Sequence, residues 1–143
     1  MDKVYVVYWS MTGNTEAMAQ AVAEGVAAAG KEAVLKTVDE VSAAELAGQA
    51  GFALGCPAMG AEVLEEGEFE PFVSELEGSL EGKKVGLFGS YGWGDGQWMR
   101  DWTERMEKAG AEVVGGEGVI CNEAPDDDAK SECQDLGKAL AAL

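Results

Sequence analysis

A short loop near the start of the chain groups the hydrogen-bond donors that a phosphate needs. It consists of Ser10, Met11, Thr12, Gly13, Asn14 and Thr15. The hydroxyl and amide side chains can donate hydrogen bonds, and the glycine lets the backbone come close to a ligand. The loop follows an apolar run over residues 4–9 and leads into a segment with helical patterning. Because the first turn of a helix presents free N–H groups and partial positive charge, the sequence predicts a site for one terminal monophosphate.

The loop contains no Lys or Arg. This excludes a Walker A loop, which requires Gly-x-x-x-x-Gly-Lys-Ser/Thr, and the loop also departs from the Gly-x-Gly-x-x-Gly pattern of dinucleotide sites. An ordinary helix N-cap is the alternative, since Ser, Thr and Asn are favoured at that position in any case. The loop alone does not separate these two functions.

The charge balance of the chain narrows the classes of partner. The 143 residues include 10 Lys and Arg against 27 Asp and Glu, a formal net charge of −17. Such a surface repels nucleic acid and anionic membranes and attracts proteins with basic docking faces, although plain solubility is a simpler use of the charge. Hydrophobic residues make up 47% of the sequence, which argues against disorder. The length predicts a single domain over residues 1–143.

Cysteine and histidine usage excludes several classes of site. Cys56, Cys121 and Cys133 lack C-x-x-C spacing, and the chain contains no His. We therefore expect no metal site and no Cys-His or Ser-His-Asp catalytic pair, and we expect free thiols in a cytoplasmic protein. No apolar run has the length of a signal segment or a transmembrane helix. A soluble monomer is the expected form of the chain.

Apolar periodicity predicts strands that alternate with helices. Helices are expected over residues 15–29, 41–48, 69–79 and 98–109, with a last helix that opens at residues 126–128. Ser42 and Glu45 have the spacing of a capping box for the second helix. Strands are expected over residues 4–9, 32–38, 51–56 and 83–91, and a fifth over 112–114 and 119–121, interrupted at Gly115 and Gly116. Short connections between alternating elements imply right-handed crossovers and a mostly parallel sheet covered on both faces.

Three glycine-containing loops follow the first, third and fourth predicted strands. They are residues 10–15, 57–67 and 92–96. In a parallel sheet the carboxyl ends of the strands share one edge, and ligands bind beyond that edge where the strand order reverses. The three loops are therefore expected to converge on one ligand, which favours the phosphate site over a simple N-cap in the first loop.

Trp93 is the strongest indication of what the ligand is. It lies between Gly92 and Gly94, where neither a helix nor a strand can bury it. An exposed indole at a ligand edge is best explained as a stacking surface for a flat ring, although Tyr91 at the strand end is an alternative. Trp98 and Trp102 have helical spacing and are expected in the core.

Two residues of the second loop suit the other side of such a ring. Met59 offers a soft apolar contact to the opposite face, or else it only fills a gap. Glu62 can accept a hydrogen bond from a ring N–H, or else it is one more solvated acid.

The three loops together resemble those of a short-chain flavodoxin of the anaerobic-bacterial type, and the resemblance extends over essentially the whole chain. The matching stretches are residues 10–16 (Ser-x-Thr-Gly-Asn-Thr-Glu), 55–62 (Gly-Cys-Pro-Ala-Met-Gly-x-Glu) and 87–95 (Leu-Phe-Gly-Ser-Tyr-Gly-Trp-Gly-Asp), with 68–72 and 98–101 in addition. The resemblance implies a flavodoxin-like three-layer α/β sandwich, in which a five-stranded parallel sheet of order 2-1-3-4-5 has helices on both faces.

The same resemblance implies a function. The chain would be a low-potential one-electron carrier, not an enzyme, whose non-covalent FMN cycles between oxidised, neutral semiquinone and hydroquinone states. Its partners would be reductases and acceptor oxidoreductases. By position, the cofactor-binding residues would be Ser10, Met11, Thr12, Gly13, Asn14, Thr15, Ala58, Met59, Gly60, Glu62, Ser90, Tyr91, Gly92, Trp93, Asp95 and Asn122.

The resemblance also implies individual roles for these positions. The first loop would hold the phosphate, Met59 and Trp93 would flank the isoalloxazine ring, and Glu62 would accept from ring N3–H. The backbone of Ser90, Tyr91, Gly92 and Asp95 would line the ring or the ribityl chain, with Asn122 as a further ribityl contact. The carbonyl of Gly60 would turn toward N5 when N5 carries a proton, a change of turn that glycine tolerates.

The residue at position 61 departs from the family pattern and bears on the reduction potentials of the flavin. Position 61 is Ala, where acidic or polar residues are frequent in related sequences. The contribution of such a side chain to the flavin potentials is missing here, so they cannot be transferred from relatives.

Three other functions are less compatible with these residues. An FMN-dependent NAD(P)H:quinone reductase of the same fold is the main alternative, but it needs room for a second substrate over the ring that Trp93 is expected to cover. A phospho-accepting receiver domain requires carboxylates after the first and third strands, where this chain has Trp9-Ser10 and Cys56-Pro57. A non-redox binding module leaves Trp93 unexplained.

Overall fold

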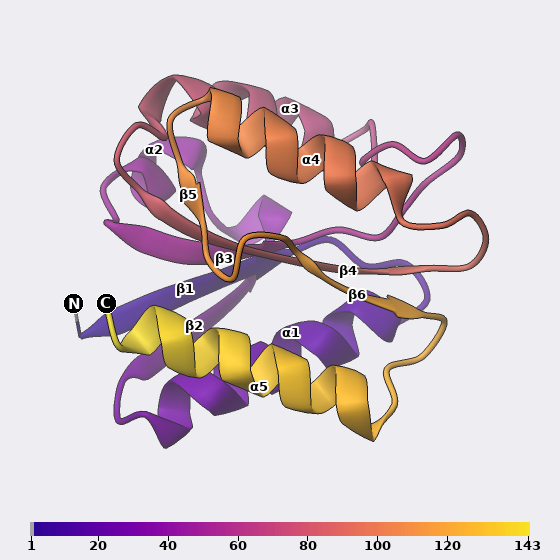
Figure 1. The fold of residues 1–143 in the computed structure, drawn as a ribbon. Helices are drawn as coiled ribbons and strands as arrows, with labels where there is room; N and C mark the ends of the chain where they lie inside the picture. The colour runs from indigo at the N-terminus through magenta and orange to yellow at the C-terminus, as the bar shows by residue number, and fades with distance from the viewer. Residues whose placement is uncertain (1) are drawn as a thin grey trace.

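A parallel sheet forms the middle layer of the protein (Figure 1), whose computed structural model describes residues 2–143. The strands are β1 (Lys3–Tyr8), β2 (Glu32–Thr37), β3 (Gly51–Gly55), β4 (Lys84–Tyr91), β5 (Glu112–Val113) and β6 (Val119–Asn122). All pairs are parallel, and the order is β2-β1-β3-β4-β5, with β6 also paired to β4. The predicted sheet order and fold class are confirmed.

The last position in the sheet is divided between two strands, as the glycine pair predicted. β5 pairs with the start of β4 through Glu112 and Val113, and β6 pairs with its end from Val119 to Asn122. Gly115 and Gly116, which lie between them, have φ values of +85° and +87°. Such angles suit glycine and interrupt an extended strand.

Helices cover both faces of the sheet. α1 (Asn14–Ala28) and α5 (Asp127–Ala141) lie on one face, whereas α2 (Ala43–Ala47), α3 (Phe69–Leu76) and α4 (Gln97–Lys108) lie on the other (Figure 1). Two short 3-10 turns, η1 (Val38–Glu40) and η2 (Glu77–Ser79), follow β2 and α3. Each face has its own apolar core, one around Met18, Val22 and Leu140 and the other around Phe52, Phe69 and Trp102. Burial of this apolar surface is the main force that holds the three layers together.

The helix ends follow the local sequence signals. Ser42 Oγ accepts a hydrogen bond from the amide of Glu45 at 3.0 Å, and the Asp126 side chain caps α5 by accepting from the amide of Ala129 at 2.8 Å. The full reciprocal capping box forms one element earlier, between Thr37 and Glu40 on η1. The second helix was predicted over residues 41–48, but α2 covers only Ala43–Ala47. Its start is later because η1 and its C-cap residue occupy positions 38–41 and Ser42 is the N-cap of α2.

Residues 2–143 contain neither a membrane-spanning helix nor a cluster of metal ligands. No helix there combines the length and the hydropathy needed to cross a membrane. Among the same residues no group of three or more His, Cys, Asp or Glu side chains is arranged to hold a metal ion.

Candidate functional site

The loops after β1, β3 and β4 meet at the carboxyl edge of the sheet, at the right in Figure 1. Between them lies a cavity of about 140 Å³. Its walls are Ser10, Met11, Thr12, Asn14, Thr15, Pro57, Ala58, Met59, Ser90, Tyr91, Gly92 and Glu123. The predicted convergence of the three loops is therefore present, and ten of the predicted site residues line one space.

The loop before α1 is organised by the hydroxyl group of Ser10. Ser10 Oγ accepts hydrogen bonds from the amides of Gly13, at 3.2 Å, and Glu16, at 3.3 Å. Gly13 is the N-cap residue, has a φ of +93° and has no side chain to cap the helix. Ser10 therefore caps the start of α1 in place of Gly13. Because its Oγ accepts both bonds, the hydroxyl proton of Ser10 stays available to donate to a ligand.

Ser90 joins the three loops at the floor of the cavity. Its amide donates to Thr15 Oγ1 at 3.4 Å, its carbonyl accepts from the amide of Ala58 at 3.0 Å, and its hydroxyl donates to the carbonyl of Glu123 at 2.6 Å. Thr15 and Ser90 are both buried, with 1% and 4% of their surfaces exposed. These bonds fix the spacing of the loops, because a buried polar group that loses its partner is costly.

The aromatic residues of the third loop have opposite environments. Trp93 is 68% exposed, whereas the ring of Tyr91 packs against that of Trp98 with centroids 5.6 Å apart. Trp98 and Trp102 are 2% exposed, so their predicted place in the core is confirmed. An indole this exposed gains nothing from the core and is free to contact a ligand.

The second loop forms a tight hairpin. Met59 and Val63 exchange backbone hydrogen bonds of 2.8 Å and 3.0 Å, and the turn between them contains Gly60, with a φ of +48°, and Glu62, with a φ of +56°. Glu62 Oε1 accepts from the amide of Gln97, the first residue of α4, at 3.1 Å. The Glu62 carboxylate is therefore part of a defined contact and is not simply a solvated charge.

Six predicted site residues lie outside the walls of the cavity. Gly60 and Glu62 lie in the loop after β3, and Trp93 lies in the loop after β4. Asp95 pairs with Arg100, at 3.0 Å between Oδ1 and Nη2, and Asn122 Nδ2 donates to the carbonyl of Tyr91 at 3.3 Å. The sixth, Gly13, faces a neighbouring hollow with Tyr8, Glu16 and Thr37.

Pro57 and Glu123 line the cavity although the sequence did not indicate them. Glu123 has a φ of +60°, and its amide donates to the carbonyl of Tyr91 at 2.8 Å. It is one acid among 27 acidic residues and follows an interrupted strand, so no signal marked it. Its carboxylate lies beside Gly92 of the third loop, where a Cβ would be 3.3 Å from Oε1, and adds an acidic group to the wall of the cavity.

The cysteines are all free. Burial raises the pKa of Cys56 to about 12, so this residue stays a neutral thiol. Its Sγ lies 3.5 Å from the carbonyl of Pro57 and accepts from the amide of Glu65 at 3.4 Å. Cys56 is thus a hydrogen-bonding residue at the base of the second loop.

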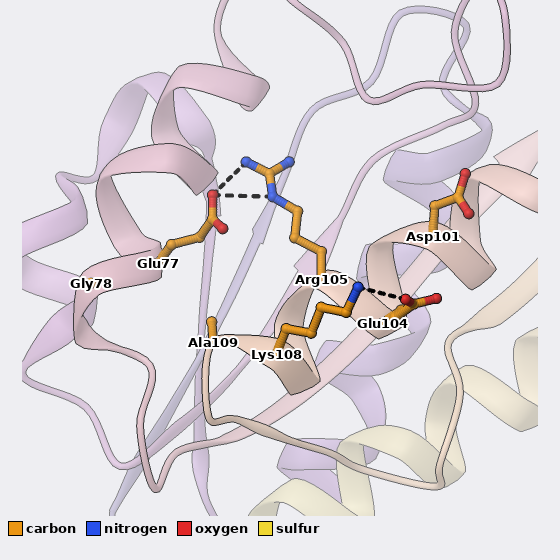
Figure 2. Close-up of a pocket in the computed structure, with 7 residues that line it drawn as sticks. All are labelled: Glu77, Gly78, Asp101, Glu104, Arg105, Lys108 and Ala109. Carbon is orange, nitrogen blue, oxygen red and sulfur yellow. Dashed lines mark hydrogen bonds and ion pairs between the residues drawn. The ribbon is translucent and has the colours of Figure 1, made fainter.

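A larger hollow of about 640 Å³ lies elsewhere, between η2 and α4 (Figure 2). Its cations are already paired: Arg105 with Glu77 at 2.6 Å, and Lys108 with Glu104 at 2.7 Å. Arg105 also pairs with Glu70 at 2.6 Å. The Arg105 contacts bind α4 to α3 and η2. Among residues 2–143, none that lines the hollow comes from a loop at the carboxyl edge of the sheet, so it is not the candidate site.

Comparison with known proteins agrees with this geometry. The family described as Flavodoxin matches residues 6–136. The chain is 50% identical to the flavodoxin of Clostridium beijerinckii over 138 aligned residues. The alignment covers 96% of this chain and 99% of the relative. It is 49% identical over 138 residues to the flavodoxin of Megasphaera elsdenii, with coverages of 96% and 98%. The solution structure of two-electron reduced Megasphaera elsdenii flavodoxin gives a TM-score of 0.90 at 48% identity, with coverages of 98% and 99%. The chain belongs to the flavodoxin family.

Proposed function

We propose that the loops around the 140 Å³ cavity hold FMN and that residues 1–143 form one FMN-binding electron-transfer unit. As a flavodoxin, the chain is an FMN-dependent electron carrier that acts with redox partners, and it is not an enzyme. The observation that supports the placement of the cofactor most strongly is the meeting of the loops after β1, β3 and β4 around one space.

The residues of the first loop suit the phosphate of FMN. Ser10, Thr12 and Asn14 supply neutral donors in the cavity wall, and the 15-residue helix α1 adds its N–H groups and dipole. Thr15 adds a buried hydroxyl that accepts from Ser90 and keeps its proton to donate. These donors stabilise a phosphate without a Lys or Arg in the loop.

The residues of the upper loops suit the isoalloxazine ring. Trp93 offers an exposed flat face, and the packing of Tyr91 against Trp98 supports Trp93 as the stacking residue. Met59 would contact the opposite face, and Glu62 would accept a hydrogen bond from N3–H. The backbone of Ala58, Gly92 and Asp95 would line the ring or the ribityl chain, and Asn122 would be a further ribityl contact.

FMN, when bound, supplies reversible one-electron transfer with protonation at ring N5. The carbonyl of Gly60 would accept a hydrogen bond from N5–H. Its exposed turn has no atom within 4 Å of an added Cβ and so has room to change conformation. The acidic surface opposes additional negative charge on the ring and so lowers the reduction potential for the second electron.

The surface around the cavity suits a basic partner. Met11, Trp93 and Val63 are large apolar residues that are 70%, 68% and 41% exposed, and the chain around them has a net charge of −17. We infer transient docking of a cytoplasmic monomer with reductases and acceptors that have basic docking faces. Rates of electron transfer should therefore fall as the ionic strength rises, and a rate independent of salt would contradict this docking.

The first test is the visible spectrum of the purified protein during stepwise reduction with dithionite. Flavin bands followed by a long-wavelength absorption after one electron support the carrier. A direct two-electron bleach, with steady NAD(P)H consumption when a quinone is added, would favour a quinone reductase. A colourless protein that does not take up added FMN would overturn both.

A further inference from the structure

We propose that Glu65 is a positioning residue for the FMN site, because it anchors the loop that presents Met59, Gly60 and Glu62. The inference rests on the proposed function of that loop. Glu65 itself is absent from the walls of the 140 Å³ cavity. It acts through the loop and not by contact with the cofactor.

The carboxylate of Glu65 caps the start of α3. Its Oε2 accepts from the amide of Gly67 at 2.7 Å, and its Oε1 accepts from those of Glu68 at 2.8 Å and Phe69 at 2.9 Å. Glu68, the N-cap residue, makes no side-chain cap of its own. One ionised side chain thus satisfies three amides that the helix cannot satisfy internally, and such charge-assisted bonds are the strong ones.

The backbone of Glu65 closes the loop at its base. Its amide donates to Cys56 Sγ at 3.4 Å, and its carbonyl accepts from the amide of Glu70 at 2.8 Å. Cys56 lies directly after β3, where its own amide donates to the carbonyl of Phe88 at 3.1 Å. Glu65 and Cys56 therefore join the end of the loop to its beginning, and the beginning to the sheet.

The tip of the loop depends on these two ends. Beyond the backbone pair of Met59 and Val63, only residues 60–62 remain, and they include both positive φ angles of the turn. Leu64, between that pair and Glu65, is 7% exposed and belongs to the core. A conformational change at Gly60 can stay local only if the residues on either side are held, and Glu65 holds one side.

The test compares Glu65→Gln with Glu66→Gln. Both variants remove one negative charge from adjacent positions, so their long-range effects on the flavin are matched. Gln at position 65 must turn its NH₂ group toward Gly67 or toward Glu68 and Phe69, where amides already point. Glu66 is exposed, and within residues 2–143 no hydrogen bond or ion pair of its side chain occurs, so its variant is the control.

The first measurement is amide exchange of Met59 and Val63 by NMR in the FMN-free protein. Glu65→Gln should speed both by roughly tenfold, and Glu66→Gln should leave both unchanged. The second measurement is the FMN dissociation constant, which should rise roughly tenfold in Glu65→Gln alone. Equal exchange and equal affinity in the two variants would overturn the proposal.

Cys56→Ala is a second variant, for use if Glu65→Gln does not fold. It removes the Sγ acceptor of the Glu65 amide from the other end of the loop and should likewise speed exchange at Met59 and Val63. Unchanged exchange there would count against the anchor. If the wild type itself fails to bind FMN, the proposed function fails, whereas the exchange comparison in the FMN-free protein still decides the role of Glu65.

Discussion

The carboxylate of Glu62 accepts a hydrogen bond from the backbone amide of Gln97 at 3.1 Å, although the two residues are 35 positions apart. The bond joins the hairpin after β3 to the first residue of α4. It also explains Gly94, because a Cβ at that position would lie 2.6 Å from Glu62 Oε1. One oxygen of Glu62 is thereby held in place, and the carboxylate is fixed near the glycine loop of Trp93.

Glu62→Ala should weaken FMN binding and loosen the start of α4 together. The substitution removes the acceptor proposed for ring N3–H and the acceptor of the Gln97 amide. We expect roughly tenfold weaker FMN binding and faster exchange of the Gln97 amide in the FMN-free protein. Titration with FMN and NMR exchange measure the two effects. Glu66→Ala is the charge-matched control, and an unchanged Gln97 amide in Glu62→Ala would contradict the capping contact.

Trp93→Ala should weaken FMN binding but leave the stability of the FMN-free protein almost unchanged. Because Trp93 is 68% exposed, its removal should change the unfolding free energy of the FMN-free protein by less than about 0.5 kcal/mol. FMN affinity should fall roughly tenfold as the stacking surface is lost. Urea unfolding and FMN titration give the two numbers.

Trp98→Ala is the matched control for that experiment. Trp98 is 2% exposed and donates from Nε1 to the carbonyl of Cys56 at 3.2 Å, so this variant should lose about 3–5 kcal/mol of stability. A larger loss of FMN affinity in Tyr91→Ala than in Trp93→Ala would instead identify Tyr91 as the main contact of the ring.

Gly60→Thr should reduce the amount of one-electron-reduced flavin in a dithionite titration. Gly60 has a φ of +48°, where a β-branched side chain is strained, so the substitution biases the turn. A hydrogen bond from N5–H to its carbonyl would be worth roughly 1 kcal/mol, or about 40 mV for one electron. Gly82→Thr places the same side chain at another glycine of positive φ, with open space around it and away from the cavity, and serves as the control. An unchanged yield in Gly60→Thr would remove Gly60 from the mechanism.

The sequence predicted the parts of this protein that depend on local pattern. The alternation of strands and helices follows from apolar spacing, and the break at Gly115 and Gly116 follows from residues that suit positive φ. The exposed position of Trp93 follows from its glycine neighbours, since no regular element can bury a side chain there.

The contacts that complete the site were not predictable in this way. The bond from Ser90 to Thr15 joins positions 75 apart, and that from Ser90 to Glu123 joins positions 33 apart. Glu65 was equally hidden, because glutamate is not a favoured N-cap and it reaches α3 from three residues before the N-cap position. Such contacts depend on where the folded chain places the loops, and no local pattern records them.

Acid should selectively remove the stabilisation that Glu65 provides. Burial alone would raise the pKa of this carboxyl, but bonds from the amides of Phe69, Glu68 and Gly67 outweigh it and hold the pKa below the ordinary 4.5. A carboxyl with a depressed pKa in the folded state stabilises the protein fully above its unfolded pKa. That stabilisation is lost as the pH falls through the lower, folded value.

Glu65→Gln should therefore lower the unfolding free energy by about 1 kcal/mol at pH 7, and the difference from wild type should shrink below about pH 4.5. The measurement is urea unfolding of the FMN-free protein from pH 7 downward, at low protein concentration because the isoelectric point is near 4.1. Differences between variants are compared because the total charge of the protein also changes with pH. Glu66→Gln should stay close to wild type throughout. A Glu65→Gln deficit that is the same at pH 7 and pH 4 would mean that packing, and not the ionised carboxylate, stabilises the start of α3.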